Sequence, residues 1–208
     1  MRSFVRSAVI AVSVLSATTA FAGESKGFHL TIDGTDVDIN PGDSLDVPLK
    51  DGHTVKVALQ RNDTVSFSGD KFSFDHDGQY SVAKSDLGGG IVQYALITSI
   101  GTGVIVQEYK GMNPAPFTDL MLQQMVQEGV AAGAKIDKQP LEETLISGQV
   151  LKGVKAETTS SNDVMDYQVA AVGRPDGGII VATFINKENV DKEGAIVDKL
   201  WSSLKTDY

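Results

Sequence analysis

Histidine is the residue type in this chain best suited to acid–base or metal chemistry, and the sequence contains three: His29, His53 and His76. No two of them stand at the close spacing with which a helix or strand presents a metal-binding or catalytic pair. We predict that each is a surface side chain on a strand or turn. A hydrolase with an unrecognised site stays open as an alternative, and it would require one of the three to be essential.

Two tetrads resemble a nucleophile motif. Residues 81–84 and 202–205 both match the Ser-x-x-Lys element of penicillin-recognising enzymes. Those enzymes also need Ser-Asp-Asn and Lys-Thr-Gly elements, and residues 161–163 read Ser-Asn-Asp instead. The glycines at 88–90 lack the Lys-Ser/Thr of a phosphate-binding loop. We therefore predict no enzymatic activity, no catalytic residues and no cofactor.

The spacing Asp36-x-Asp38-x-Asn40 is that of the first ligands of a calcium loop. Such a loop requires glycine at its sixth position and a bidentate glutamate at its twelfth, where this chain has Pro41 and Val47. We predict two strands with an acidic exposed face, and no metal site.

Residues 1–22 are typical of an export signal. Arg2 and Arg6 precede an apolar stretch over 8–17, and residues 20–22 read Ala-Phe-Ala, the small-x-small pattern of a cleavage site. The stretch is shorter than the roughly 20 residues that span a bilayer. We predict cleavage between Ala22 and Gly23, export to the periplasm or the medium, and no stable membrane insertion afterwards.

The overall charge narrows the range of partners. The 208 residues include 18 Lys and Arg against 27 Asp and Glu. Removal of the two signal arginines leaves 16 basic residues and a net charge of −11. This balance disfavours nucleic acid and anionic membranes as partners. The chain has no cysteine, which excludes disulfides, cysteine zinc sites and thiolate nucleophiles.

The element order predicts an α+β fold. Residues 27–69 alternate apolar and polar side chains between turn signals, which indicates β-hairpins, and residues 70–110 continue this pattern with larger side chains. Helical periodicity follows over 117–132 and 190–204, with three strands between the helices. Residues 179–185 are continuously apolar, as in a central strand covered on both faces. An antiparallel sheet with helices packed on it fits this order.

Helix 117–132 has apolar rows wider than one buried face needs. Met121, Met125 and Trp201 stand at helical spacing, for which core packing is the default interpretation. A groove between helix and sheet that binds a small apolar ligand is the alternative.

Residues 72–80 (Phe-Ser-Phe-Asp-His-Asp-Gly-Gln-Tyr) and the closing Leu200-Trp201, with the element order between them, are similar to one superfamily. It holds the PsbP proteins of photosystem II, the Ran-binding Mog factor and the bacterial DcrB-like envelope proteins. Tyr80 stands where members often have tryptophan, and the preceding proline is absent. The resemblance implies an α/β/α sandwich used for protein binding or assembly, without common catalytic residues.

We therefore predict a signal peptide over 1–22, an N-terminal β-hairpin region over 23–69 and a PsbP/DcrB-like α+β domain over 70–208. The expected function is that of an exported, non-enzymatic module that binds another envelope or secreted protein. A carrier of a small apolar ligand and a hydrolase are the alternatives.

Overall fold

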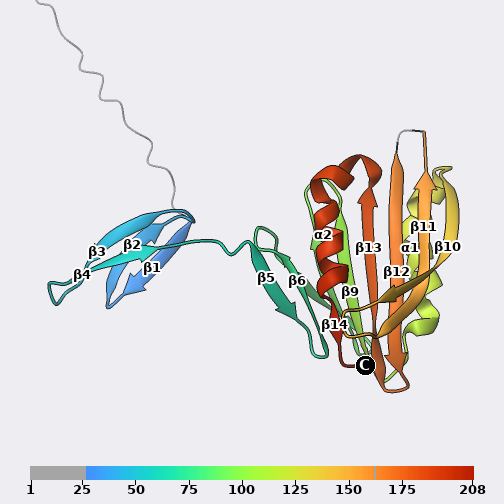
Figure 1. Ribbon diagram of the computed structural model, residues 1–208, viewed down its shortest axis with the longest axis horizontal. Helices are drawn as coiled ribbons and strands as arrows, with labels where there is room; N and C mark the ends of the chain where they lie inside the picture. Colours follow the sequence, from blue (N-terminus) through green and yellow to red (C-terminus); the bar gives the residue numbers. More distant parts are fainter. Residues whose placement is uncertain (1–26, 162) are drawn as a thin grey trace, which may run out of the picture. The chain divides into compact units, whose positions relative to one another are not determined.

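The computed structural model describes residues 27–161 and 163–208, so the predicted signal and its cleavage point at Ala22–Gly23 lie outside the described residues. The chain divides into two compact units, one ending at Gln60 and one beginning at Arg61 (Figure 1). The strands are β1 (Phe28–Ile32), β2 (Thr35–Ile39), β3 (Ser44–Pro48), β4 (Thr54–Ala58), β5 (Thr64–Ser68), β6 (Phe72–Asp77), β7 (Ala83–Gly88), β8 (Ile91–Ile97), β9 (Gly103–Lys110), β10 (Lys135–Thr144), β11 (Val150–Thr159), β12 (Val164–Arg174), β13 (Gly177–Asn186) and β14 (Lys205–Thr206). The helices are α1 (Thr118–Ala131) and α2 (Val190–Ser203), each preceded by a short 3-10 turn, η1 (Ala115–Phe117) and η2 (Lys187–Asn189).

The first unit consists of two β-hairpins, β1–β2 and β3–β4. Asp33 and Gly34 form the first turn with positive φ angles of 47° and 72°, the left-handed conformation that two-residue hairpin turns require. Ile39 and Val47 are buried within this unit. The small hairpin sheets predicted at the N-terminal end are confirmed.

The second unit is built on a seven-stranded sheet with the order β10-β11-β12-β13-β9-β8-β7. Every neighbouring pair is antiparallel. A smaller three-stranded sheet has the order β14-β6-β5. The predicted α+β class, an antiparallel sheet with helices packed on it, is confirmed.

The two helices pack on opposite faces of the large sheet (Figure 1). Ile179 and Val181 of β13 belong to the core that contains Leu200 of α2. Ile180, between them, belongs to the core that contains Leu122 of α1. Successive side chains of a strand point to opposite faces, so a strand covered on both sides must be apolar throughout. This confirms the prediction for residues 179–185.

The two faces are covered to different extents. On the α2 face, the small sheet adds Phe72 and Phe74 to the core, next to Tyr94 of β8. On the other face, α1 packs on β11 and β12. Beside α1, side chains of β8 and β9 on this face, among them Ile91 and Ile105, stay partly exposed.

The predicted boundary between residues 69 and 70 falls inside the β5–β6 hairpin, whereas the compact units divide after Gln60. The reason is aromatic packing: Phe67 of β5 contacts the rings of Phe72 and Phe74 of β6 at centroid distances of 6.2 and 5.5 Å. This cluster ties β5 to the second unit.

Two further expectations need correction. Four strands, not three, lie between the helices, because β10 was missed: nearly all its side chains are exposed, so it lacks the period-two pattern. His76 is buried and not on the surface, since it shares the inward phase of β6 with Phe72 and Phe74.

Candidate binding groove along α1

An apolar groove of about 450 Å³ runs between α1 and the edge strand β10. Leu122, Val126 and Val130 of α1 form one wall, and Ile136 of β10 forms the other. Leu122 and Val126 are buried, whereas Val130 is 42% exposed and Ile136 40% exposed. The wide apolar surface predicted for this helix is therefore divided between a row that packs on the sheet and a row that lines the groove.

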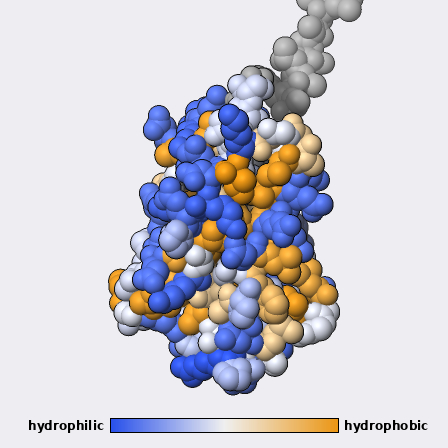
Figure 2. Space-filling view, turned by 90° about the vertical axis from the view of Figure 1, so that its right-hand side faces the viewer, coloured by the Kyte–Doolittle hydropathy of each residue, from blue (hydrophilic) through white to orange (hydrophobic). Residues whose placement is uncertain are grey.

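Charged and amide side chains border this groove. Asp119 of α1 and Lys138 of β10 form an ion pair across one end, and Gln123 and Gln127 also line it. Figure 2 views the side of the unit that carries β10 and α1, where a strip of hydrophobic side chains lies between hydrophilic ones. The site is thus an open apolar groove with a polar rim, which suits apolar side chains of a partner or a small apolar ligand.

The strand that borders this groove is at the edge of the sheet. β10 pairs with β11 on one side and stands last in the strand order. The backbone groups of an edge strand on its outer side can pair with an added strand. Pro140 interrupts this edge because it has no N–H to donate, so the segment 135–139 next to the groove is the part best able to pair.

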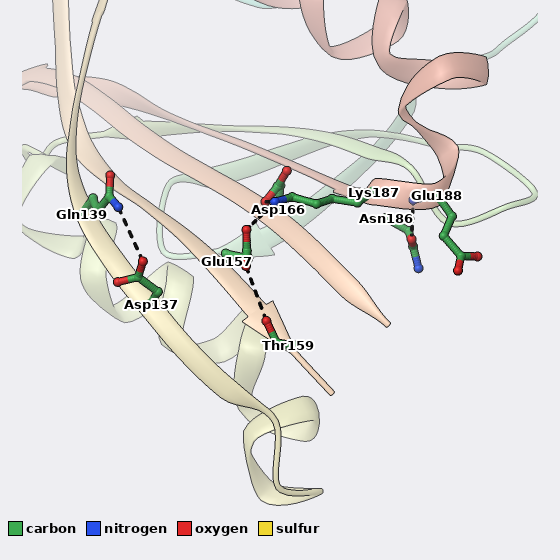
Figure 3. Close-up of polar contacts among 8 residues, drawn as sticks. All are labelled: Asp137, Gln139, Glu157, Thr159, Asp166, Asn186, Lys187 and Glu188. Carbon is green, nitrogen blue, oxygen red and sulfur yellow. Dashed lines mark hydrogen bonds and ion pairs between the residues drawn. The ribbon is translucent and has the colours of Figure 1, made fainter. Parts of the chain in front are cut away.

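On the face of the sheet opposite α1, β10, β11 and β12 carry a polar cluster around a hollow of about 300 Å³ (Figure 3). Lys187 forms an ion pair with Glu157 and lies 3.9 Å from Asp166. The ammonium lowers the pKa of Glu157 below its usual range, while burial raises the pKa of Asp166. Because the lysine offsets much of the negative charge, we interpret this cluster as an ion-pair network that ties η2 to the sheet.

A buried carboxylate lies under the β5–β6 turn. Glu108 is 1% exposed and accepts hydrogen bonds from the backbone N–H groups of Asp70 (3.2 Å) and Lys71 (2.9 Å). It also accepts one from the hydroxyl of Tyr208, at 3.2 Å. Burial, with the neighbouring Glu108, raises the pKa of Tyr208 above its usual range, which keeps the phenol protonated as a donor. All three donors belong to the chain itself, which indicates that Glu108 has a structural role.

The histidines do not come together. His29 and His53 lie exposed in the first unit, where His53 bonds Asp51 in the turn before β4. His76 belongs to the second unit, and its Nδ1 lies 2.8 Å from the carbonyl oxygen of Asp77. Among the hydrogen bonds of the described residues, none joins a histidine to a serine or threonine hydroxyl.

His29 lies between two carboxylates, which gives a test by titration. Its Nδ1 is 2.8 Å from an oxygen of Asp38, and its Nε2 is 3.6 Å from Asp36. The hydrogen bond to Asp38 is the main cause that raises the pKa of His29 above 6.5. A raised pKa means that this interaction stabilises the fold at low pH and that the contribution is lost as the pH rises through the folded-state value.

We expect an NMR titration to place the midpoint of His29 above 6.5, and Asp38→Asn to lower it toward that value. Asp36→Asn, which removes the more distant carboxylate, should lower it less. A midpoint that Asp38→Asn leaves unchanged would show that the hydrogen bond does not govern this histidine.

The remaining sequence candidates are engaged elsewhere. The carboxylate of Asp36 accepts from Thr31, and the side-chain oxygen of Asn40 accepts from the N–H of Gly27. Lys84 lies over the ring of Tyr94, 5.8 Å from its centroid. Within residues 27–161 and 163–208, no group of three or more His, Cys, Asp or Glu side chains is placed to hold a metal ion. No helix in that same part of the chain is long and apolar enough to cross a membrane.

The sequence does not predict this groove, because one of its walls belongs to β10, whose side chains show no period-two pattern. The only available signal was the surplus of apolar residues on helix 117–132.

No protein-family model and no curated protein matches the chain. A crystal structure of a protein from Bacteroides thetaiotaomicron is similar over 72% of this chain and 50% of its own, with 10% sequence identity and a TM-score of 0.36. This chain thus spans about half the length of that protein. The resemblance to the PsbP-like superfamily stays a prediction.

Proposed function

We propose that this protein is an exported, non-enzymatic module that binds an extended segment of another envelope or secreted protein along β10. The observation that carries the proposal is the apolar groove bordered by an edge strand. Such a site offers a partner two kinds of contact at once. The strand edge supplies backbone hydrogen bonds, and the groove receives every second side chain of the added strand.

The geometry of β10 supports this binding mode. Ile136 and Lys138 both line the groove, as alternate residues on one face of the strand must. An added strand would place its own alternate side chains on the same face, beside Val130 of α1. Affinity would come from the edge, and selectivity for apolar residues would come from the groove.

A carrier of a small apolar ligand is the second candidate, because a volume of about 450 Å³ is in the range of ligand sites. The edge strand favours the protein partner, since an apolar small molecule makes no use of backbone donors and acceptors. Solvent extraction of the purified protein followed by mass spectrometry separates the two. A stoichiometric apolar compound would favour the carrier.

The direct test places a photo-crosslinking amino acid at Gln127, on the rim of the groove, and at Ile146, in the β10–β11 turn, as the control. We expect one dominant protein adduct from position 127 and none from position 146. Val130→Asp should reduce the adduct at least tenfold, since it puts a charge where an apolar side chain would be buried. Equal adducts from both positions, or an adduct insensitive to Val130→Asp, would refute the proposal.

A further inference from the structure

The other flank of α1 borders an uncovered face of the large sheet. There, a hollow of about 360 Å³ lies between α1 and strands β8 and β9, lined by residues that include Phe117, Leu120, Ile91 and Tyr109. Leu120 is 51% exposed, and Leu87 at the end of β7 is 52% exposed. α1 packs on β11 and β12, and Ile180 and Ala182 of β13 are buried in the core beside it, so the uncovered part of this face lies over β9, β8 and β7.

This face carries no charged side chain on β7, β8, β9 or β13, all of which the structure describes. The strand register places its residues in rows: Ala83–Ala95–Ile105–Ala182, Ser85–Gln93–Gln107–Ile180, Ile97–Gly103–Phe184 and Ile91–Tyr109–Gly178. Charged residues make up 22% of the chain, so a four-strand face without any of them is unusual. Depletion of charge is characteristic of the centres of protein interfaces.

Three polar side chains on this face, Tyr109, Gln107 and Gln93, are hydrogen bonded to one another. The Tyr109 hydroxyl donates to the Gln107 side chain at 2.7 Å, and Gln107 donates to the side chain of Gln93 at 2.9 Å. Burying a polar group costs free energy mainly when its hydrogen bond to water is not replaced. A partner can therefore cover these two hydrogen bonds without breaking them.

We infer that this face binds a second copy of the chain, as a two-fold symmetric dimer. The face is self-complementary because it carries a ridge, the flank of α1, next to the uncovered strands. In this dimer the two-fold axis passes through the interface, between the ridge and the uncovered strands. It places α1 of each copy on the uncovered strands of the other copy. Strands are spaced about 4.8 Å apart and helices pack about 10 Å apart, so the position beside α1 is wide enough for one helix.

The charge of this face and the area that it would bury are consistent with a second copy of the chain as its partner. Each copy is acidic, so two copies repel one another where carboxylates meet. The strands of this face carry none, and Glu128, four residues after Gln124, is the carboxylate on the flank of α1. Three uncovered strands about 20 Å long give roughly 300 Å² of sheet per copy, and the flank of α1 adds roughly 200 Å². Two copies would bury about 1,000 Å² in total, the minimum expected of a specific interface. We therefore expect dissociation in the micromolar range.

Sedimentation velocity of the mature chain, from about 1 to about 200 μM, tests the dimer. We expect a monomer–dimer equilibrium in that range, and Leu120→Glu should weaken it at least tenfold. Ile146→Glu is the matched control, because it makes the same charge change at a residue 77% exposed in a different part of the second unit. A monomer throughout, or equal weakening by both substitutions, would overturn the inference.

The absence of cysteine allows a second, geometric test. A mixture of Leu120→Cys and Ala95→Cys proteins should form a mixed disulfide, because α1 of one copy would lie over β8 of the other. A mixture of Ile146→Cys and Ala95→Cys should form little. Mixed disulfide in equal yield from both mixtures would contradict this arrangement. The groove beside β10 lies on the opposite flank of α1, so failure of the dimer leaves the proposed partner site untouched, and the reverse also holds.

Discussion

Replacement of Glu108 by alanine is expected to lower the free energy of unfolding of the second unit by about 3 kcal/mol, the upper end of the range for hydrogen bonds to a charged group. The carboxylate holds the N–H groups of Asp70 and Lys71 and the hydroxyl of Tyr208. Its loss leaves these three donors without their acceptor. The β5–β6 turn and the end of the chain at Tyr208 would lose their common anchor.

Urea unfolding followed by the fluorescence of Trp201, the chain's single tryptophan, measures this change. Trp201 packs against the same core as Phe72 and Tyr208, so it reports on the affected region. Two milder variants serve as controls. Glu108→Gln keeps the shape and one acceptor, and Tyr208→Phe removes a single hydrogen bond, so each should cost about 1–2 kcal/mol.

A double-mutant cycle makes the prediction specific. If Glu108 and Tyr208 act through their hydrogen bond, Tyr208→Phe should cost less in the Glu108→Ala background than in the native protein. Additive effects would mean that the two side chains contribute to stability independently. That result would contradict the interpretation of Glu108 as a common anchor.

Gly153→Ala is expected to destabilise the second unit by roughly 3 kcal/mol, because the added methyl group has no space. An alanine Cβ at this position in β11 would lie 1.9 Å from the carbonyl oxygen of Val169 and 2.8 Å from the Cα of Ala170. Both are backbone atoms of the neighbouring strand β12. A flexible side chain could move aside, but here the strands themselves would have to separate.

Gly129→Ala is the matched control, since it adds the same methyl group to a helix. Its Cβ would meet its nearest neighbour at 3.9 Å, so the space is open. Alanine favours the helix over glycine by up to about 1 kcal/mol. Urea unfolding should therefore move the two variants in opposite directions. Destabilisation by both would indicate that the crowding at Gly153 is not the cause.

Local patterns were sufficient for much of this fold. Period two in β6 and the continuous apolar run of β13 predicted strands because each reflects burial on one face or on both. Pro116 and Gly133 bracketed α1, since proline suits a helix start and Gly133 has a φ of 94° that few other residues adopt. These signals act within a few residues, so they can be read without knowing the rest of the molecule.

Other features depended on residues far apart in the chain. β10 carries no clear pattern, because an edge strand with exposed side chains needs none, and the groove beside it could not be foreseen. A surface position is predicted for His76 as for the other two histidines, but the phase of β6 turns it inward with Phe74. The unit boundary follows from aromatic packing of Phe67 that composition does not reveal.

The sheet face beside α1, which carries no charged side chain on its strands, shows most clearly what the sequence determines and what the tertiary structure decides. By itself, the sequence determined the α+β class, the two helices and the absence of cysteine chemistry, because these follow from composition and short-range periodicity. Only the tertiary structure brought Ala182 into one row with Ala95 and Ile105, since the pairing register joins β13 to β9, which lie far apart in the chain. A surface that binds a partner depends on the pairing register of strands and on packing between distant segments, and short-range sequence patterns do not reveal either.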